Sequence, residues 1–248
     1  MSRLAAVLLL LLASPAFAAG PPNNQPCAAA PQFVMAPRPL DALKAAIDAH
    51  RPVRILAVGS GATTGAAGVQ AGSAFPDRMR DALRAALPLV EVRLTVRGGR
   101  GMTAEEMLPL VEAEVKQAPP VVVLWQTGTV EAVRGLRVDR MRRALRAGLD
   151  AVRAAGGSLV LIDPQFTRAL RANTDLEPYE AELQQIATLP SASLFRRYEL
   201  TRGWALEGRF DPERAAKDAR EEVLARLNAC LGETLARYLL NGAGIAAP

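Results

Sequence analysis

A serine and two threonines stand in a glycine-rich loop in the first third of the chain. The loop reads Gly59-Ser60-Gly61-Ala62-Thr63-Thr64-Gly65 and directly follows an apolar run, residues 53–58. A serine hydroxyl is a nucleophile when a neighbouring base takes its proton, and hydroxyl and backbone N–H groups bind carbonyl oxygens and anions. The loop therefore indicates either nucleophilic chemistry or ligand binding.

Two further polar loops also follow apolar runs. They are Gly98-Gly99-Arg100-Gly101 and Gln126-Thr127-Gly128-Thr129. Because the carboxyl ends of parallel strands meet at one edge of a sheet, we expect the three loops to form a pocket. Its expected lining is Ser60, Gly61, Thr63, Thr64, Gly98, Gly101, Gln126, Gly128 and Thr129. The alternative is that the glycines only permit tight turns between strands and helices.

Three arginines, Arg97, Arg100 and Arg134, flank these loops. They could attract a carboxylate or a phosphate. The alternative, which we keep for most of them, is that they are ordinary solvated charges on the surface. A nucleotide site is disfavoured, since the first loop misses the G-x-G-x-x-G spacing by one residue and no lysine follows it as in a P-loop. We expect no cofactor.

The segments that must position these loops alternate between strand and helix patterns. Strands are expected at 53–58, 90–96, 121–125, 159–162 and 193–195, and helices at 41–50, 75–87, 103–116, 136–154, 177–189 and most of 211–240. Thr103 and Glu106 have the spacing of a capping box. The alternation predicts right-handed crossovers and an α/β fold, a three-layer α/β/α sandwich with a five-stranded parallel sheet of the flavodoxin-like kind.

The first 19 residues have the features of an export signal: Arg3, an apolar stretch over 4–13, and Ala16-Phe17-Ala18 as a cleavage site. Residues 20–38 are rich in proline and predict an extended arm, and 39–248 predict one domain. We therefore expect a periplasmic or secreted protein. The apolar stretch is shorter than the roughly 20 residues that span a bilayer, so no transmembrane anchor is expected.

The chain has only two cysteines, Cys27 and Cys230. In an oxidising compartment, we expect a disulfide between them that ties the arm to the last helix, the alternative being two free thiols. With one histidine and no C-x-x-C pair, the sequence indicates no metal site. The net charge of +5 is too modest to point to nucleic acid as a partner.

The order of the loops resembles that of the SGNH or GDSL esterases. Ala57-Val58-Gly59-Ser60-Gly61-Ala62-Thr63 is similar to their first block, Gly98-Gly99-Arg100-Gly101 to the second with its oxyanion-hole glycine, and Trp125-Gln126-Thr127-Gly128-Thr129 to the third. Leu194-Phe195-Arg196-Arg197-Tyr198 and Ala229-Cys230-Leu231 are similar to an exported proteobacterial branch of that family. The resemblance covers nearly the whole mature chain and implies the SGNH-hydrolase type of sandwich.

The chain departs from this family at the catalytic positions. Gly61 stands where the family has its nucleophilic serine, and Val130 stands where it has the oxyanion asparagine. His50 precedes the first strand, and six strand residues span about 20 Å, so its imidazole cannot reach Ser60. The closing Asp-x-x-His could align with Asp211-Pro212-Glu213-Arg214 or with 218–222, and neither segment contains a histidine.

These patterns predict a degenerate hydrolase that binds an acylated, sugar-bearing or anionic envelope ligand without cleaving it. The first alternative is an active esterase or acyltransferase that uses Ser60 as a displaced nucleophile, with Glu221 or Glu222 as its base. The second is a structural envelope protein with no ligand. The expected partner is a small molecule, a glycan or an acyl chain, and we expect a monomer.

Overall fold

The computed structural model describes residues 27–65 and 72–246. Its centre is a sheet of five parallel strands: β1 (Val53–Gly59), β2 (Val92–Gly98), β3 (Val122–Gln126), β4 (Ser158–Ile162) and β5 (Ala192–Phe195). Their spatial order is β2-β1-β3-β4-β5. The predicted α/β fold with a five-stranded parallel sheet is confirmed. The expected export signal and the first part of the arm lie outside the described residues.

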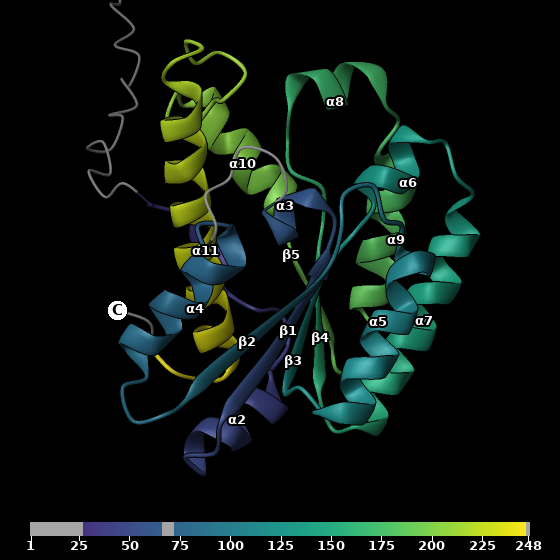
Figure 1. Ribbon diagram of the computed structural model, residues 1–248, viewed down its shortest axis with the longest axis vertical. Coiled ribbons are helices and arrows are strands. Elements are labelled where there is room, and N and C mark those ends of the chain that lie inside the picture. The colour runs from purple at the N-terminus through teal and green to yellow at the C-terminus, as the bar shows by residue number, and fades with distance from the viewer. Residues whose placement is uncertain (1–26, 66–71, 247–248) are drawn as a thin grey trace, which may run out of the picture.

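Helices cover both faces of the sheet (Figure 1). One layer contains α2 (Asp41–Asp48), α4 (Phe75–Ala86) and the long α11 (Arg220–Gly242), and the other contains α5 (Ala104–Gln117), α7 (Val138–Ala154) and α9 (Glu177–Ala187). The capping box at α5 is confirmed, since Thr103 Oγ1 accepts from the Glu106 N–H and the Glu106 carboxylate accepts from the Thr103 N–H.

Short helices fill the connections that the sequence suggested were loops. They are α1 (Pro31–Val34), α3 (Gly61–Thr64), α6 (Thr129–Val133), α8 (Arg168–Asn173) and α10 (Arg197–Leu206). Most of them are too short to show a clear apolar period, and α10 has hydrophobic and charged residues mixed around its axis. None of the described helices is long and apolar enough to cross a membrane.

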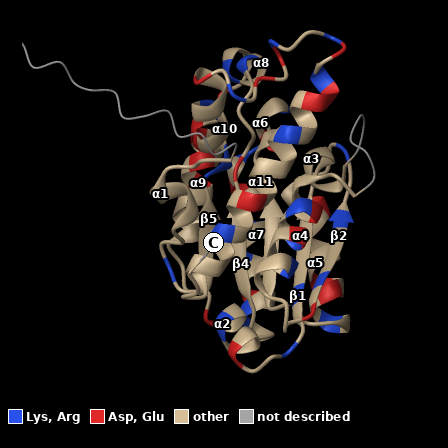
Figure 2. Ribbon diagram, turned by 90° about the vertical axis from the view of Figure 1, so that its left-hand side faces the viewer, with Lys and Arg blue, Asp and Glu red and all other residues tan. Residues whose placement is uncertain are grey.

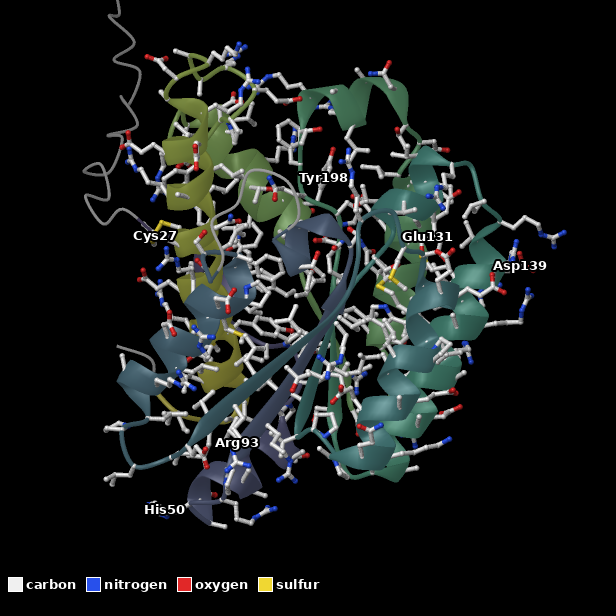
Figure 3. The ribbon with its side chains drawn as sticks, in the orientation of Figure 1. Cys27, His50, Arg93, Glu131, Asp139 and Tyr198 are labelled. Atoms are coloured by element: carbon white, nitrogen blue, oxygen red, sulfur yellow. A yellow bond between two sulfur atoms is a disulfide. The ribbon has the colours of Figure 1, made fainter. Side chains whose placement is uncertain are left out.

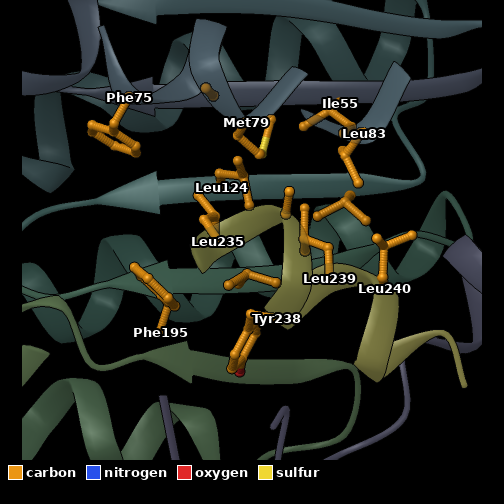
Figure 4. Close-up of a cluster of buried hydrophobic side chains, with 14 of the residues drawn as sticks. Ile55, Phe75, Met79, Leu83, Leu124, Phe195, Leu235, Tyr238, Leu239 and Leu240 are labelled. Carbon is orange, nitrogen blue, oxygen red and sulfur yellow. The ribbon is translucent and has the colours of Figure 1, made fainter. Parts of the chain in front are cut away.

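The larger core cluster lies between the sheet and the layer of α4 and α11. Figure 4 shows Met79 and Leu83 of α4 facing Leu235 and Leu239 of α11 over the strands. The two helices touch at Gly232, where a Cβ would lie 2.4 Å from the Cβ of Arg78. The second cluster packs α5, α7 and α9 against the opposite face. The apolar strands are therefore buried on both sides, as parallel strands usually are.

The segment before α2 is fastened to the last helices. A disulfide joins Cys27 to Cys230, as predicted. Trp204 Nε1 donates to the carbonyl of Ala28, and Asn241 Nδ2 donates to the carbonyl of Val34. Residues 27–40 thus pack along α10 and α11 rather than extend into solvent.

Candidate functional site

The three glycine-rich loops meet at the carboxyl edge of the sheet, as the strand order requires. Ser60 follows β1 and Gln126 ends the neighbouring β3. The side-chain oxygen of Gln126 accepts three hydrogen bonds, from the N–H of Ser60 at 3.1 Å, its hydroxyl at 3.0 Å and the Thr63 hydroxyl at 3.2 Å. Gln126 is only 1% exposed. Its three hydrogen bonds therefore fix the first loop from inside the protein.

Close backbone approach explains the glycines at the ends of β1 and β2. A Cβ on Gly98, whose φ is +112°, would lie 2.0 Å from the carbonyl oxygen of Gly59. A Cβ on Gly59 would lie 2.2 Å from the Thr63 hydroxyl oxygen. Neither position can carry a side chain without moving the loops, so the glycines have a packing role as well as a turn role.

A buried carboxylate, Glu131, organises the third loop. It accepts from the N–H of Ala104 at 2.6 Å, the Thr127 hydroxyl at 2.9 Å and the N–H of Gly128 at 3.0 Å. Ala104 begins α5, so the carboxylate joins this helix to the third loop and lies at the positive end of the helix dipole. Figure 3 shows Glu131 near the upper end of the sheet.

The expected lining residues divide into two groups. Thr63, Gln126 and Gly128 are buried, which corrects the expectation that they line the pocket surface. The Gln126 side-chain oxygen, the Thr63 hydroxyl and the Gly128 N–H all take part in hydrogen bonds within the protein, where they support the loops. The residues that are partly or fully exposed are Ser60, Gly61, Thr64, Gly98, Gly101 and Thr129.

The carboxyl ends of β4 and β5 hold a buried aspartate, Asp163, and a buried arginine, Arg197, whose contact the sequence did not reveal. Asp163 accepts from the N–H of Tyr198 at 2.8 Å, and Arg197 Nε donates to the Asp163 carbonyl at 3.0 Å. Burial raises the pKa of Asp163 to about 7 and lowers the pKa of Arg197 to about 10. Arg197 lies over the ring of Phe75, and its buried Nη1 has no hydrogen-bond partner.

The structure provides no base for Ser60 within the described residues. Its hydroxyl donates to the Gln126 amide, which cannot take up a proton. His50 lies in the turn after α2, at the opposite edge of the sheet, as predicted (Figure 3). Glu221 and Glu222 are exposed at the start of α11. The Ser60 hydroxyl is therefore held by an acceptor that is not a base.

The segment that could match the family's closing Asp-x-x-His makes structural contacts instead. Asp211 pairs with Arg168 at 2.5 Å, and the Glu213 carboxylate accepts from the N–H groups of Arg168 and Ala169. Arg214, which stands at the histidine position in this alignment, is largely exposed. The segment thus secures the start of α8.

The arginines around the loops differ in their surroundings. Arg97 pairs with Glu114 of α5 at 2.5 Å, whereas Arg100 and Arg134 are exposed and form no ion pair with other described residues. Arg134 lies against the second loop, because a Cβ on Gly101 would be 3.1 Å from its Nη2. Among the described residues, no group of three or more His, Cys, Asp or Glu side chains could hold a metal ion.

Sequence reasoning missed Glu131, Asp163 as an ionisable group, and the buried position of Arg197. A signal for Glu131 was present, since it stands three residues after Gly128 and a glutamate at that spacing often returns to the start of a helix. No local pattern marks Arg197, because an arginine at the start of a helix is ordinarily solvated.

Comparisons with known proteins agree with this architecture. Residues 26–245 match the sequence profile of the non-GDSL lipase-like family. A catalytic mutant of Axe2, an acetylxylan esterase from Geobacillus stearothermophilus, superposes with a TM-score of 0.57 at 16% identity, over 77% of this chain and 94% of that chain. LAE5, an alpha/beta hydrolase enzyme from the metagenome of Lake Arreo, Spain, superposes with a TM-score of 0.56 at 17% identity, over 75% and 98%.

At such identities these structural likenesses establish the fold alone. No curated protein sequence matches the chain.

Proposed function

The chain belongs to the non-GDSL lipase-like family, and on this premise we propose that it binds an acylated, sugar-bearing or anionic ligand at the carboxyl edge of its sheet without hydrolysing it. The ligand would contact the exposed parts of the three loops, which are Ser60, Gly61, Thr64, Gly98, Gly101 and Thr129. Arg100 and Arg134 would attract an anionic group from the rim of the site.

One observation carries the non-catalytic part of the proposal. The Ser60 hydroxyl donates to an amide oxygen, and that oxygen also accepts the Ser60 N–H. Acyl transfer needs a base for the nucleophile and donors for the oxyanion, and removing either costs several kcal/mol of barrier. Gly61 and Val130 stand at the two positions where the SGNH resemblance places those groups.

The binding part rests on how the loops are supported. Gln126 and Glu131 each accept three internal hydrogen bonds, so the first and third loops are fixed before any ligand arrives. Fixed donors lose little conformational freedom on binding, which favours affinity.

Export to the periplasm or the medium is part of the proposal. The signal features of residues 1–19 support it, and so does the disulfide between Cys27 and Cys230, since disulfides persist in oxidising compartments. Fractionation of cells that express the full chain tests this, with the processed protein expected outside the cytoplasm.

The central experiment isolates the processed protein under native conditions and identifies bound molecules by native mass spectrometry. We expect an adduct that is weakened in Ala62→Trp, because residue 62 is exposed on the first loop, and kept in Leu89→Trp, because Leu89 is 79% exposed beyond the opposite end of β2. An adduct that persists equally in both variants would place the ligand elsewhere.

Hydrolysis of short aryl esters distinguishes the alternative. We expect no turnover above that of Ser60→Ala, and Gly61→Ser alone should restore none because the histidine and the oxyanion asparagine are also missing. Turnover by the wild type that disappears in Ser60→Ala would instead establish an esterase with a displaced nucleophile.

A further inference from the structure

The sheet leaves one long edge open at β2. This strand has seven residues and pairs only with β1, and Figure 2 shows it at the outer edge of the sheet. The Val53 N–H donates to the Glu91 carbonyl, and the Gly99 N–H donates to the Gly59 carbonyl. Backbone groups of a strand alternate in direction, so residues 91, 93, 95, 97 and 99 bond to β1 while 92, 94, 96 and 98 point outward.

Among the described residues, the outward backbone groups of β2 form hydrogen bonds only with side chains, and only some of these groups do so. Arg84 Nε and Nη2 donate to the Val92 carbonyl, and Arg97 Nη1 donates to the Val96 carbonyl. The N–H and C=O groups of Leu94 have no partner among the described residues. An open edge of this kind can accept another strand.

The side chains of β2 form two different faces. Val92, Leu94 and Val96 pack toward the layer of α4 and α11. On the opposite face, the exposed charges run along the strand in the order Glu91, Arg93 and Arg97, with Thr95 between the two arginines. Beside them lies a cavity of about 170 Å³ whose lining includes Arg93, Thr95 and Glu114. The layer containing α5 therefore does not fill this face up to the edge.

The charge order favours one antiparallel pairing of β2 with a second copy of itself over the two neighbouring registers. With Leu94 opposite Leu94, Val92 lies opposite Val96, Arg93 opposite Thr95, and Glu91 opposite Arg97, twice by symmetry. Shifting the pairing by two residues toward either end places Arg93 opposite Arg93 or opposite Arg97. Like charges directly opposite each other are destabilising, so the sequence disfavours the shifted pairings.

We propose that β2 is a homodimer interface, in which two chains pair antiparallel about Leu94 and join their sheets through Glu91–Arg97 contacts across a two-fold axis. The same patch then serves both copies, as closed dimers require. On association, Arg84 and the Arg97 guanidinium leave the edge carbonyls, and the N–H groups of the partner strand replace them. The ion pairs of Glu91 with Arg93 and of Arg97 with Glu114 within each chain are exchanged for the contacts across the axis. This proposal departs from the monomer expected from the sequence and does not require a ligand at the carboxyl edge of the sheet.

Two charge-reversal variants test the pairing directly. Glu91→Arg places arginines opposite each other in its homodimer, and Arg97→Glu places glutamates opposite each other, so each should weaken self-association by at least about tenfold. An equimolar mixture of the two restores both opposite-charge contacts. Analytical ultracentrifugation should therefore detect dimers in the mixture at concentrations where each variant alone is monomeric.

A backbone variant gives an independent measurement. Leu94→Pro removes an outward N–H but no hydrogen bond to β1, and proline is tolerated at an edge strand in that orientation. It should abolish the dimer while circular dichroism shows a folded protein. The proposal is overturned if the wild type stays monomeric up to about 1 mM, if the mixture stays monomeric, or if folded Leu94→Pro still dimerises.

Discussion

The carboxyl ends of β1, β2 and β3 and those of β4 and β5 bury their polar groups in different ways. In the first region, the buried acceptors of Gln126 and Glu131 each take three hydrogen bonds from backbone or hydroxyl donors. In the second, the buried Asp163 faces the buried Arg197, whose Nη1 has no partner.

The first region uses its buried polar groups to hold loops in place, whereas the second region buries groups that can carry charge. Donors that converge on one acceptor fix a loop and satisfy that acceptor, whereas the burial of a carboxyl group and a guanidinium carries a desolvation cost. We infer that the first region is built for a fixed geometry. The second region is where the stability of the protein depends on protonation.

The largest effect should come from Glu131→Ala. It leaves the N–H groups of Ala104 and Gly128 and the Thr127 hydroxyl without their acceptor, at a cost of about 1–3 kcal/mol for each buried group. We expect a loss of about 5 kcal/mol in the free energy of unfolding, measured by urea denaturation. Glu131→Gln keeps one acceptor oxygen, so its free energy of unfolding should lie between those of the wild type and Glu131→Ala. A loss below about 1 kcal/mol would refute the role of the carboxylate.

The second prediction concerns pH. Burial raises the pKa of Asp163 from its ordinary value of 3.8 to about 7, so the folded protein holds this proton more tightly than the unfolded chain. The resulting stabilisation is fully present below about 3.8 and is lost as the pH rises through about 7. It amounts to at most about 4 kcal/mol.

Asp163→Asn isolates this effect, because all other carboxyl groups are common to both proteins. The stability of the wild type relative to Asp163→Asn should rise as the pH is lowered from 8 to 4, in thermal or urea unfolding at each pH. A difference that stays constant over this range would show that Asp163 does not titrate there.

A smaller loss is expected for Gln126→Leu, which removes the shared acceptor of the first loop. We expect about 2 kcal/mol, because the buried Thr63 hydroxyl and the Ser60 N–H lose their partner. Ser60→Ala removes only one of the three bonds and should cost about half as much or less. Equal losses in both variants would mean that Gln126 does not organise the loop.

The smallest change in the free energy of unfolding is expected at an exposed ion pair, which serves as the reference for the buried groups. Arg140 and Glu105 form an ion pair at 2.6 Å, with about half of each side chain exposed. Glu105→Gln should change the free energy of unfolding by less than about 1 kcal/mol, since exposed pairs are screened by water. A larger loss would show that surface charge contributes more here than the buried networks suggest.

Much of the fold could be predicted from the sequence because its signals are local. The apolar runs from Val53 and Val122 are strands, and Thr103 and Glu106 form the capping box. The disulfide joins cysteines 203 residues apart and was predictable for another reason, since Cys27 and Cys230 are the only two cysteines in the sequence. The error at β2, which begins at Val92 and not at residue 90, follows from the turn that precedes it, where Val90 packs into the core without pairing.

The candidate site was predictable only in outline. The sequence located the three loops at one edge, but it could not tell which of their polar groups face inward. Thr63, Gln126 and Gly128 are buried because neighbouring loops cover them, and that covering depends on residues 30 to 70 positions away along the chain.

The sequence by itself determined what this protein lacks at the expected catalytic positions: a serine at residue 61, an asparagine at residue 130, and a histidine that can reach Ser60. Those statements need only residue identity and strand order. The tertiary structure alone decided that Ser60 is held by an amide, that Glu131 joins the third loop to α5, and that Asp163 and Arg197 share a buried site. Burial and hydrogen bonding between distant segments are properties of packing, which no local pattern encodes.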